Sequence, residues 1–202
     1  MLSVCINHRN RSFCEVDGAL VPVFRRAYDA LIPSLDATFE PAEIVIADWP
    51  GDARLGLGTW CNNPRVRRIR CNGQFTRGGG RNSAAAHANG DVLFFMDADM
   101  LLVPQVIMRG LEIVREGKAF FPLYKRLNRQ GVPVIDGIGH GNAMVSAEHF
   151  RQSGGFPVKQ NWGGEDTTFA RWFDQHGLMV REYIDGFYHL WHSAEVQHVE
   201  SA

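Results

Sequence analysis

Two carboxylates, Asp97 and Asp99, directly follow the apolar run at residues 92–96. In extended backbone, side chains at positions i and i+2 point to the same side of the chain. Two carboxylates held together repel each other, and removing them from water adds to that cost. A divalent cation relieves the repulsion and offers positive charge to a phosphate. The pair therefore predicts a metal and phosphate site, although both acids could instead cap a turn or the next helix.

Two histidines near the C-terminal end, His189 and His192, have a spacing that suits one helical turn or a tight loop. Each alone would be read as an ordinary surface or core residue. Together with the acidic pair they form a mixed oxygen and nitrogen ligand set, and imidazole favours a transition metal such as Mn²⁺ over Mg²⁺. We therefore expect Mn²⁺ or another divalent cation at Asp99, His189 and His192. The four cysteines are scattered without a Cys-x-x-Cys pair, so a zinc site is not expected.

A glycine-rich segment that ends in two acids precedes a helix containing residues 169–173. Gly163 and Gly164 let the backbone approach a ligand closely. An acid at a helix start is ordinarily a cap. Alternatively, one carboxylate of Glu165-Asp166 takes the proton of an attacking hydroxyl. Trp162 would then offer a flat apolar face to a sugar ring.

Short apolar segments alternate with segments of helical periodicity along the chain. We expect strands at residues 2–6, 43–47, 66–71, 92–96 and 119–123, and helices at residues 17–35, 78–89 and 104–116. This alternation predicts an α/β/α sandwich around a mainly parallel sheet. Polar residues follow three of the strands, at 8–11, 48 and 97–99. Ligands of open α/β sheets bind at the carboxyl ends of strands, so these residues are expected to share one pocket.

The composition is that of an ordinary globular protein, with 202 residues, 45% hydrophobic residues and a net charge of −1. We expect one domain over residues 1–202. The charge gives no support for binding nucleic acid or acidic membranes. No apolar run reaches the about 18 residues of a membrane span, and the N-terminus does not resemble a signal peptide. The expected location is the cytoplasm, including the inner face of a membrane by peripheral association.

Several segments together resemble the GT-A glycosyltransferases, and within them the inverting β-1,4-galactosyltransferase-like group. Gly-Gly-Phe-Pro at 154–157, followed by Trp-Gly-Gly-Glu-Asp at 162–166, is similar to that group's signature. Asp97-Ala98-Asp99 is similar to its Asp-x-Asp motif, and the two histidines fall where it places its remaining metal ligands. Phe-Thr-Arg at 75–77 and Arg-Asn-Ser-Ala at 81–84 are similar to its Phe-x-Arg segment and the helix that follows.

The resemblance implies a GT-A fold whose residues 1–100 mainly bind the nucleotide and whose residues 101–202 mainly bind the acceptor. It implies that a UDP-sugar donor is bound by His8, Arg9, Arg11, Asp48, Phe75, Arg77, Asp97 and Asp99. In this assignment Asp48 receives hydrogen bonds from uracil, Arg11 and Arg77 pair with phosphate, and Asp97 faces the ribose or supports its loop. Asp166 is implied as the catalytic base, and Trp162, Gly163, Gly164 and Glu165 as the acceptor site.

The chain also departs from the group. Gly78-Gly79-Gly80 replaces bulkier residues, residues 138–141 lack an aromatic residue that helps choose the donor sugar, and no membrane anchor is expected. These departures favour a bacterial enzyme of surface polysaccharide synthesis that transfers a sugar, with inversion, to a hydroxyl of a glycan or glycolipid. The alternatives are a catalytically silent sugar-binding module and a sugar nucleotidyltransferase. The latter usually carries a glycine-rich phosphate loop after the first strand, where this chain has residues 8–11.

Overall fold

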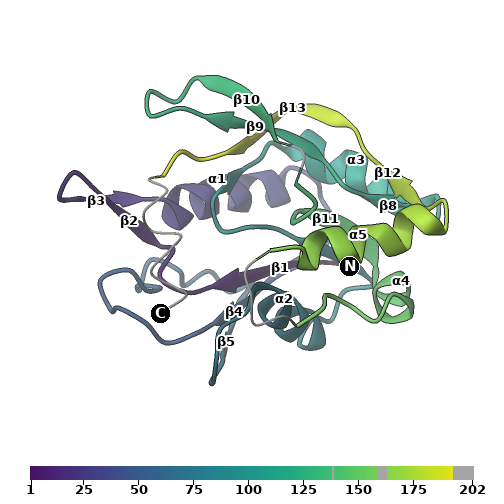
Figure 1. Cartoon of the computed structure of the whole chain (residues 1–202), viewed down its shortest axis with the longest axis horizontal. Coiled ribbons are helices and arrows are strands. Elements are labelled where there is room, and N and C mark those ends of the chain that lie inside the picture. Colours follow the sequence, from purple (N-terminus) through teal and green to yellow (C-terminus); the bar gives the residue numbers. More distant parts are fainter. Residues whose placement is uncertain (138, 159–162, 193–202) are drawn as a thin grey trace.

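The computed structural model describes residues 1–137, 139–158 and 163–192 (Figure 1). Its largest sheet has seven strands in the order β12-β8-β11-β6-β1-β4-β5. Their bounds are Met179–Val180, Ala119–Phe120, Ala143–Ser146, Val92–Phe95, Leu2–His8, Ala42–Asp48 and Val66–Arg70. Strands β6, β1, β4 and β5 pair in parallel, whereas β11 is antiparallel to both of its neighbours.

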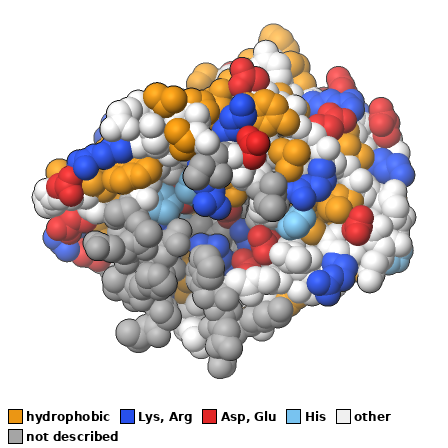
Figure 2. All heavy atoms as spheres, turned by 45° about the horizontal axis from the view of Figure 1, so that its top comes forward, with side chains coloured by type: hydrophobic (Ala, Val, Ile, Leu, Met, Phe, Trp, Pro, Cys, Tyr) orange, Lys and Arg blue, Asp and Glu red, His pale blue; other side chains and the backbone are white. Residues whose placement is uncertain are grey.

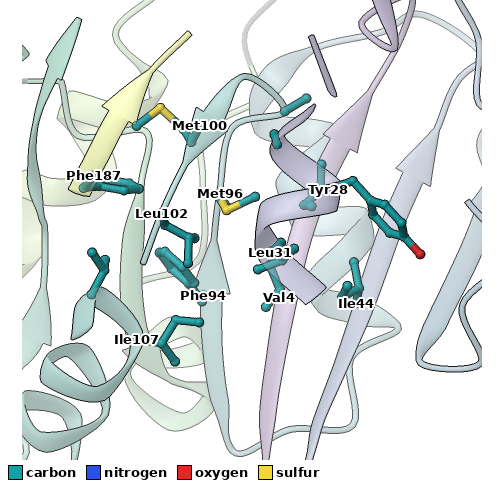
Figure 3. Packing of buried hydrophobic residues seen from close by; sticks show 14 of the residues in the cluster. Val4, Tyr28, Leu31, Ile44, Phe94, Met96, Met100, Leu102, Ile107 and Phe187 are labelled. Atoms are coloured by element: carbon teal, nitrogen blue, oxygen red, sulfur yellow. The ribbon is translucent and has the colours of Figure 1, made fainter. Parts of the chain in front are cut away.

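Helices cover both faces of this sheet, which confirms the predicted sandwich. Helices α1 (Phe24–Asp36) and α3 (Pro104–Arg115) contribute to one hydrophobic cluster, part of which Figure 3 shows. Helices α2 (Arg77–Ala86) and α5 (Glu165–Gln175) contribute to the other, and α4 (Ala147–Gln152) packs beside them. Successive side chains of β1 point to opposite faces of the sheet, so Val4 and Ile6 belong to the first cluster and Cys5 to the second.

A second sheet brings the C-terminal part of the chain next to the segment that follows the carboxyl end of β6. Its four strands have the order β10-β9-β13-β7, with bounds Pro133–Gly137, Leu123–Leu127, Tyr183–His189 and Met100–Leu101. Strand β13 pairs with β7, so that His189 lies opposite Met100. The backbone N–H of Leu190 also donates to the carbonyl of Asp99 at 2.8 Å. This pairing, across about 90 residues of sequence, is what joins the two halves of the predicted metal site.

Two predicted elements are corrected. The helix expected at 17–35 begins only at Phe24, because residues before it form a hairpin of β2 (Phe13–Val16) and β3 (Ala19–Pro22). Its two turn residues, Asp17 and Gly18, have φ of 51° and 77°, which is the geometry of a two-residue hairpin turn. The strand expected at 119–123 is two strands, β8 and β9, which belong to different sheets.

The helix expected at 78–89 lies at Arg77–Ala86 and ends earlier than predicted. The remaining predicted strands and the helix at 104–116 are present within one or two residues. Within the described ranges, no helix combines the length and the apolar character needed to cross a bilayer.

Candidate active site

The three predicted metal ligands lie together. The Oδ2 atom of Asp99 is 3.2 Å from Nε2 of His192 and 3.4 Å from Nε2 of His189. One ligand atom from each of the three residues lies within 4.8 Å of the others. The second carboxylate oxygen of Asp99 is buried and has no hydrogen-bond partner among the described residues. This donor set fits a divalent transition metal, and an ion would satisfy the unpaired oxygen.

Electrostatics within this group favour the ionised carboxylate. Burial alone would raise the pKa of Asp99, but His189 and His192 hold it well below its usual range. Burial lowers the pKa of His189, and the adjacent Asp99 outweighs that effect and leaves it raised. The ring of His189 is also stacked on Tyr124, at 6.0 Å between centroids and 26° between planes. Strand β13 therefore holds one predicted ligand, His189, in an orientation fixed by packing. Of the two arrangements that the spacing suits, a helical turn is not present in the described residues 189–192, and His192 lies in the irregular segment after the strand.

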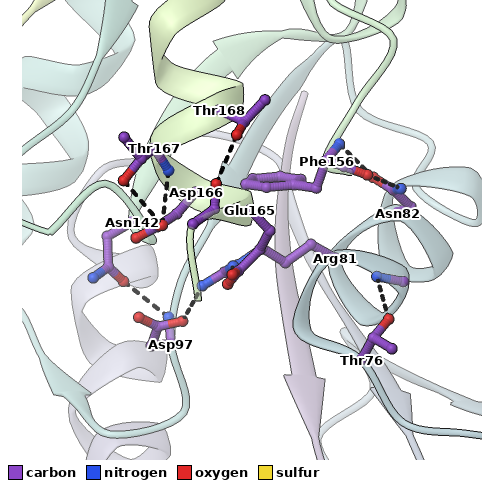
Figure 4. A network of polar contacts seen from close by, with 12 residues as sticks. Thr76, Arg81, Asn82, Asp97, Asn142, Phe156, Glu165, Asp166, Thr167 and Thr168 are labelled. Carbon is purple, nitrogen blue, oxygen red and sulfur yellow. Dashed lines mark hydrogen bonds and ion pairs between the residues drawn. The ribbon is translucent and has the colours of Figure 1, made fainter. Parts of the chain in front are cut away.

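Asp97, the other acid of the motif, has a different environment. Its Oδ1 atom accepts a hydrogen bond of 2.7 Å from Nη2 of Arg81, and its backbone N–H donates to Oδ1 of Asn142 at 2.8 Å. The second guanidinium nitrogen of Arg81 donates to Oε1 of Glu165 at 3.0 Å. Figure 4 shows these contacts as one network that joins the acidic motif to the start of α5.

The N-terminus of α5 presents Asp166 near this network. Gly163 and Gly164 have φ of 93° and 82°, a left-handed conformation that glycine adopts without strain. They turn the chain into α5, whose first residue, Glu165, is buried against Arg81, whereas Asp166 is half-buried. The Oδ1 atom of Asp166 accepts from the backbone N–H of Thr167 at 2.7 Å. Asp166 therefore remains partly exposed beside this network.

A second buried acid lies at the end of β4. One oxygen of Asp48 is 2.7 Å from Nδ1 of His8, and the other accepts from Nε and Nη2 of Arg68 at 2.8 and 2.6 Å. Burial raises the pKa of Asp48, but the bonds from His8 and Arg68 prevail and lower it. His8 has no exposed surface, and its Nε2 atom bonds to Ser12 at 3.1 Å. His8 is therefore not accessible to a nucleotide in this structure, contrary to the predicted contact. It instead orients Asp48.

The remaining residues predicted for the donor lie around this edge of the sheet. The guanidinium of Arg9 lies 5.9 Å from the ring of Phe75, which packs edge-on against Trp49 at 5.4 Å. Arg11 follows β1 and is half-buried, and Arg77 begins α2 behind its cap, Thr76. Figure 2 shows acidic and basic side chains together in a hollow of the molecular surface. Trp162 lies outside the described residues.

Sequence reasoning gave no role to several residues that hold the site. Arg81 and Asn142 fix Asp97, Arg68 pairs with Asp48, and Tyr124 packs on His189. The burial of Arg81 could have been predicted from the sequence, because Arg81 shares a face of α2 with Gly78 and Ala84 at helical spacing. Small residues at that spacing mark a packed face, on which an arginine needs an acidic partner.

The sandwich of mainly parallel strands, with acids at their carboxyl ends, is the GT-A fold that the resemblance implied. The crystal structure of S. aureus TarS 1-349 in complex with UDP-GlcNAc matches it with a TM-score of 0.68 and 16% sequence identity, over 100% of this chain and 61% of that one. Residues 19–173 match the model of the family described as Glycosyl transferase family 2, so the chain belongs to this family.

Curated relatives match at lower coverage. Chondroitin sulfate N-acetylgalactosaminyltransferase 1 of Homo sapiens is 27% identical over 150 residues, which cover 61% of this chain and 28% of that protein. Chondroitin sulfate N-acetylgalactosaminyltransferase 2 of Homo sapiens is 28% identical over 151 residues, with the same coverage. The chain thus spans just over a quarter of the length of these relatives.

Proposed function

We propose that the chain is an inverting, metal-dependent glycosyltransferase that moves a sugar from a UDP-sugar to a hydroxyl of a glycan or glycolipid. The observation that carries the proposal is the convergence of three features at one edge of the sheet. These are the ligand set of Asp99, His189 and His192, the half-buried Asp166 at the start of α5, and the buried carboxylate of Asp48. Membership in glycosyl transferase family 2 and the UDP-GlcNAc bound by TarS support the same class of donor.

In the proposed reaction, Asp166 accepts the proton of the acceptor hydroxyl as its oxygen attacks the anomeric carbon. The new C–O bond forms on the face opposite the bond to the diphosphate, which breaks with its electron pair and leaves as UDP. Attack from the opposite face inverts the anomeric configuration. A positioned general base of this kind contributes about 10²–10⁴-fold to the rate.

Other residues bind and orient the reactants in this proposal. Asp99, His189 and His192 would hold Mn²⁺ or another divalent cation, which supplies positive charge for the leaving diphosphate when bound. Arg11 and Arg77 pair with phosphate oxygens. Asp48 faces the uracil, and its orientation depends on His8 and Arg68.

The donor and acceptor contacts are completed by residues that fall on both halves of the chain. Arg9 and Phe75 border the donor, Asp97 faces the ribose or supports its loop, and Glu165 and the two preceding glycines border the acceptor together with Trp162. We assign residues 1–100 mainly to the nucleotide and 101–202 mainly to acceptor and catalysis. The proposed setting is bacterial surface polysaccharide synthesis at the cytoplasmic side of the membrane. Its basis is the triple glycine at residues 78–80 and the lack, at residues 138–141, of the aromatic residue that helps choose the donor sugar.

Product identification separates this proposal from its rivals. The protein is incubated with Mn²⁺, glycan acceptors and a panel of UDP-GlcNAc, UDP-GalNAc, UDP-glucose and UDP-galactose, and separately with UTP and sugar 1-phosphates. Release of UDP with at least one donor supports the transferase. Release of pyrophosphate from UTP would instead identify a nucleotidyltransferase. If neither UDP nor pyrophosphate is released, the remaining interpretation is a catalytically silent sugar-binding module.

A further inference from the structure

Arg81 joins the segment of Asp97 to the start of α5, and the proposed reaction requires a fixed distance between these two segments. Its side chain is only 2% exposed, yet it carries a full charge and contacts two carboxylates. Nη2 donates to Asp97 of the metal and donor motif at 2.7 Å, and Nη1 donates to Glu165 of the acceptor helix at 3.0 Å. A buried charge is tolerated only when such partners compensate for the lost water, so the three groups depend on one another.

The position of Arg81 is itself fixed by the packing of α2. A Cβ atom at Gly80 would lie 2.5 Å from Cβ of Asn7, and one at Gly78 would lie 2.2 Å from the carbonyl oxygen of Pro157. Helix α2 therefore packs directly against β1 and the loop before α5. The guanidinium also lies 5.0 Å from the ring of Phe156. Arg81 thus extends from a helix that has little room to shift.

The two carboxylates have little freedom as well. Asp97 is held through its backbone by Asn142, and a Cβ atom at Gly141 would lie 2.7 Å from Nη2 of Arg81 and 2.8 Å from Oδ2 of Asp97. The backbone at Gly141 therefore closes over this ion pair. Glu165 is the first residue of α5 and directly precedes Asp166. A displacement of Glu165 consequently moves the proposed base.

An arginine suits this position better than a lysine. The guanidinium offers separate nitrogens in a rigid plane, so one side chain can bond to two carboxylates in different directions. A lysine retains the charge but presents it at a single nitrogen on a flexible stem. Replacing Arg81 with lysine therefore removes the fixed separation between Asp97 and Glu165 while the charge balance is kept.

We propose that Arg81 is a positioning residue for sugar transfer, which sets the distance between the donor motif at Asp97 and the acceptor helix that carries Asp166. The inference rests on the proposed function, because it concerns the relation of donor and base in that reaction. Arg81 acts through Asp97 and Glu165 and does not touch the reacting atoms. Its loss should therefore impair turnover much more than it impairs binding of UDP.

The test compares Arg81→Lys with wild type in two measurements, the kcat for UDP release in the presence of acceptor and the Kd for UDP with Mn²⁺. We expect kcat to fall by about 10²-fold, the loss typical of a misplacement of about 1 Å, and the Kd for UDP to remain nearly unchanged. Arg109→Lys is the matched control, since Arg109 also bonds to two carboxylates, Glu182 and Glu112, but on the surface of α3. It should leave both quantities as in wild type.

Glu165→Gln and the double variant with Arg81→Lys test whether Arg81 acts through Glu165. If Arg81 acts through Glu165, adding Glu165→Gln to Arg81→Lys lowers kcat by much less than the product of the two single effects. An unchanged kcat in Arg81→Lys, an equal loss of kcat and UDP affinity, or fully multiplicative effects would each overturn the inference. Wild-type protein without turnover on any donor would instead overturn the proposed function, and the inference with it.

Discussion

Asn82 connects α2 to the loop that leads toward α5, and its removal should measurably destabilise the protein. Its Nδ2 atom donates to the carbonyl of Phe156 at 2.8 Å, and its Oδ1 atom accepts from the N–H of Phe156 at 2.9 Å. Phe156 is 2% exposed, and its ring stacks on Phe169 with 4.0 Å between centroids. Asn82→Ala would leave one backbone donor and one backbone acceptor without partners.

The expected cost follows from those two groups. Each buried backbone group left unpaired costs about 1–3 kcal/mol, which gives a range of about 2–6 kcal/mol for the pair. Because these hydrogen bonds are only part-buried, water can replace some of them, and we expect about 2–3 kcal/mol. Asn72→Ala, on an exposed residue before α2, is the control and should change stability by less than about 0.5 kcal/mol.

Urea denaturation followed by tryptophan fluorescence gives the free energy of unfolding of each variant. The slope of the transition should be unchanged, so the effect appears as a lower midpoint. A loss for Asn82→Ala no larger than that for Asn72→Ala would show that the Asn82 contacts do not hold this loop.

Three further predictions concern the proposed metal site and the buried pair of His8 and Asp48. Asp99→Asn should abolish the rise in thermal midpoint that MnCl₂ gives wild type, and an undiminished rise would exclude Asp99 as a ligand. Gly137→Ala would place a Cβ atom 2.0 Å from the ring of Tyr124, which stacks on His189, and should weaken Mn²⁺ binding by about 10–100-fold in a calorimetric titration. Unchanged affinity would mean that this packing does not orient the ligand. Burial lowers the pKa of His8, so His8 holds fewer protons in the folded protein than in the unfolded chain as the pH falls below 6.5. The contribution of His8 to stability should be full above that pH and be lost as the pH falls, so urea melts of His8→Gln should lose less stability than wild type between neutral and acidic pH.

The sequence was sufficient for elements whose pattern is unambiguous. Apolar runs gave β1 and β6, the β-branched segment at 43–47 gave β4, and the Ala-rich and Pro-led segments gave α2 and α3. The start of α1 was wrong, because Leu20 and Val23 fit helical spacing while also fitting the end of a hairpin. The Asp17-Gly18 dipeptide is a hairpin-turn signal, and its turn chemistry prevailed over the helical pattern.

The proximity of Asp99, His189 and His192 could be anticipated because their residue types restrict the chemistry and the resemblance restricts their positions. Their contact depends on β13 pairing with β7, a long-range register that local patterns do not encode. The same holds for Arg81 and Arg68, whose carboxylate partners lie on other elements of the fold. Residue type and spacing can therefore propose the members of a site, but the groups that orient them emerge only from tertiary packing.

The central claim is that Asp166 is the base of a sugar transfer at this site, and one comparison tests it most directly. Asp166→Asn and Asp174→Asn, an exposed position on the same helix, are each measured for kcat of UDP release with acceptor and for the Kd of UDP with Mn²⁺. We predict that Asp166→Asn lowers kcat by about 10²–10⁴-fold with the Kd of UDP nearly unchanged, whereas Asp174→Asn changes neither. A retained kcat in Asp166→Asn, or a loss of UDP affinity as large as the loss of kcat, would contradict the account.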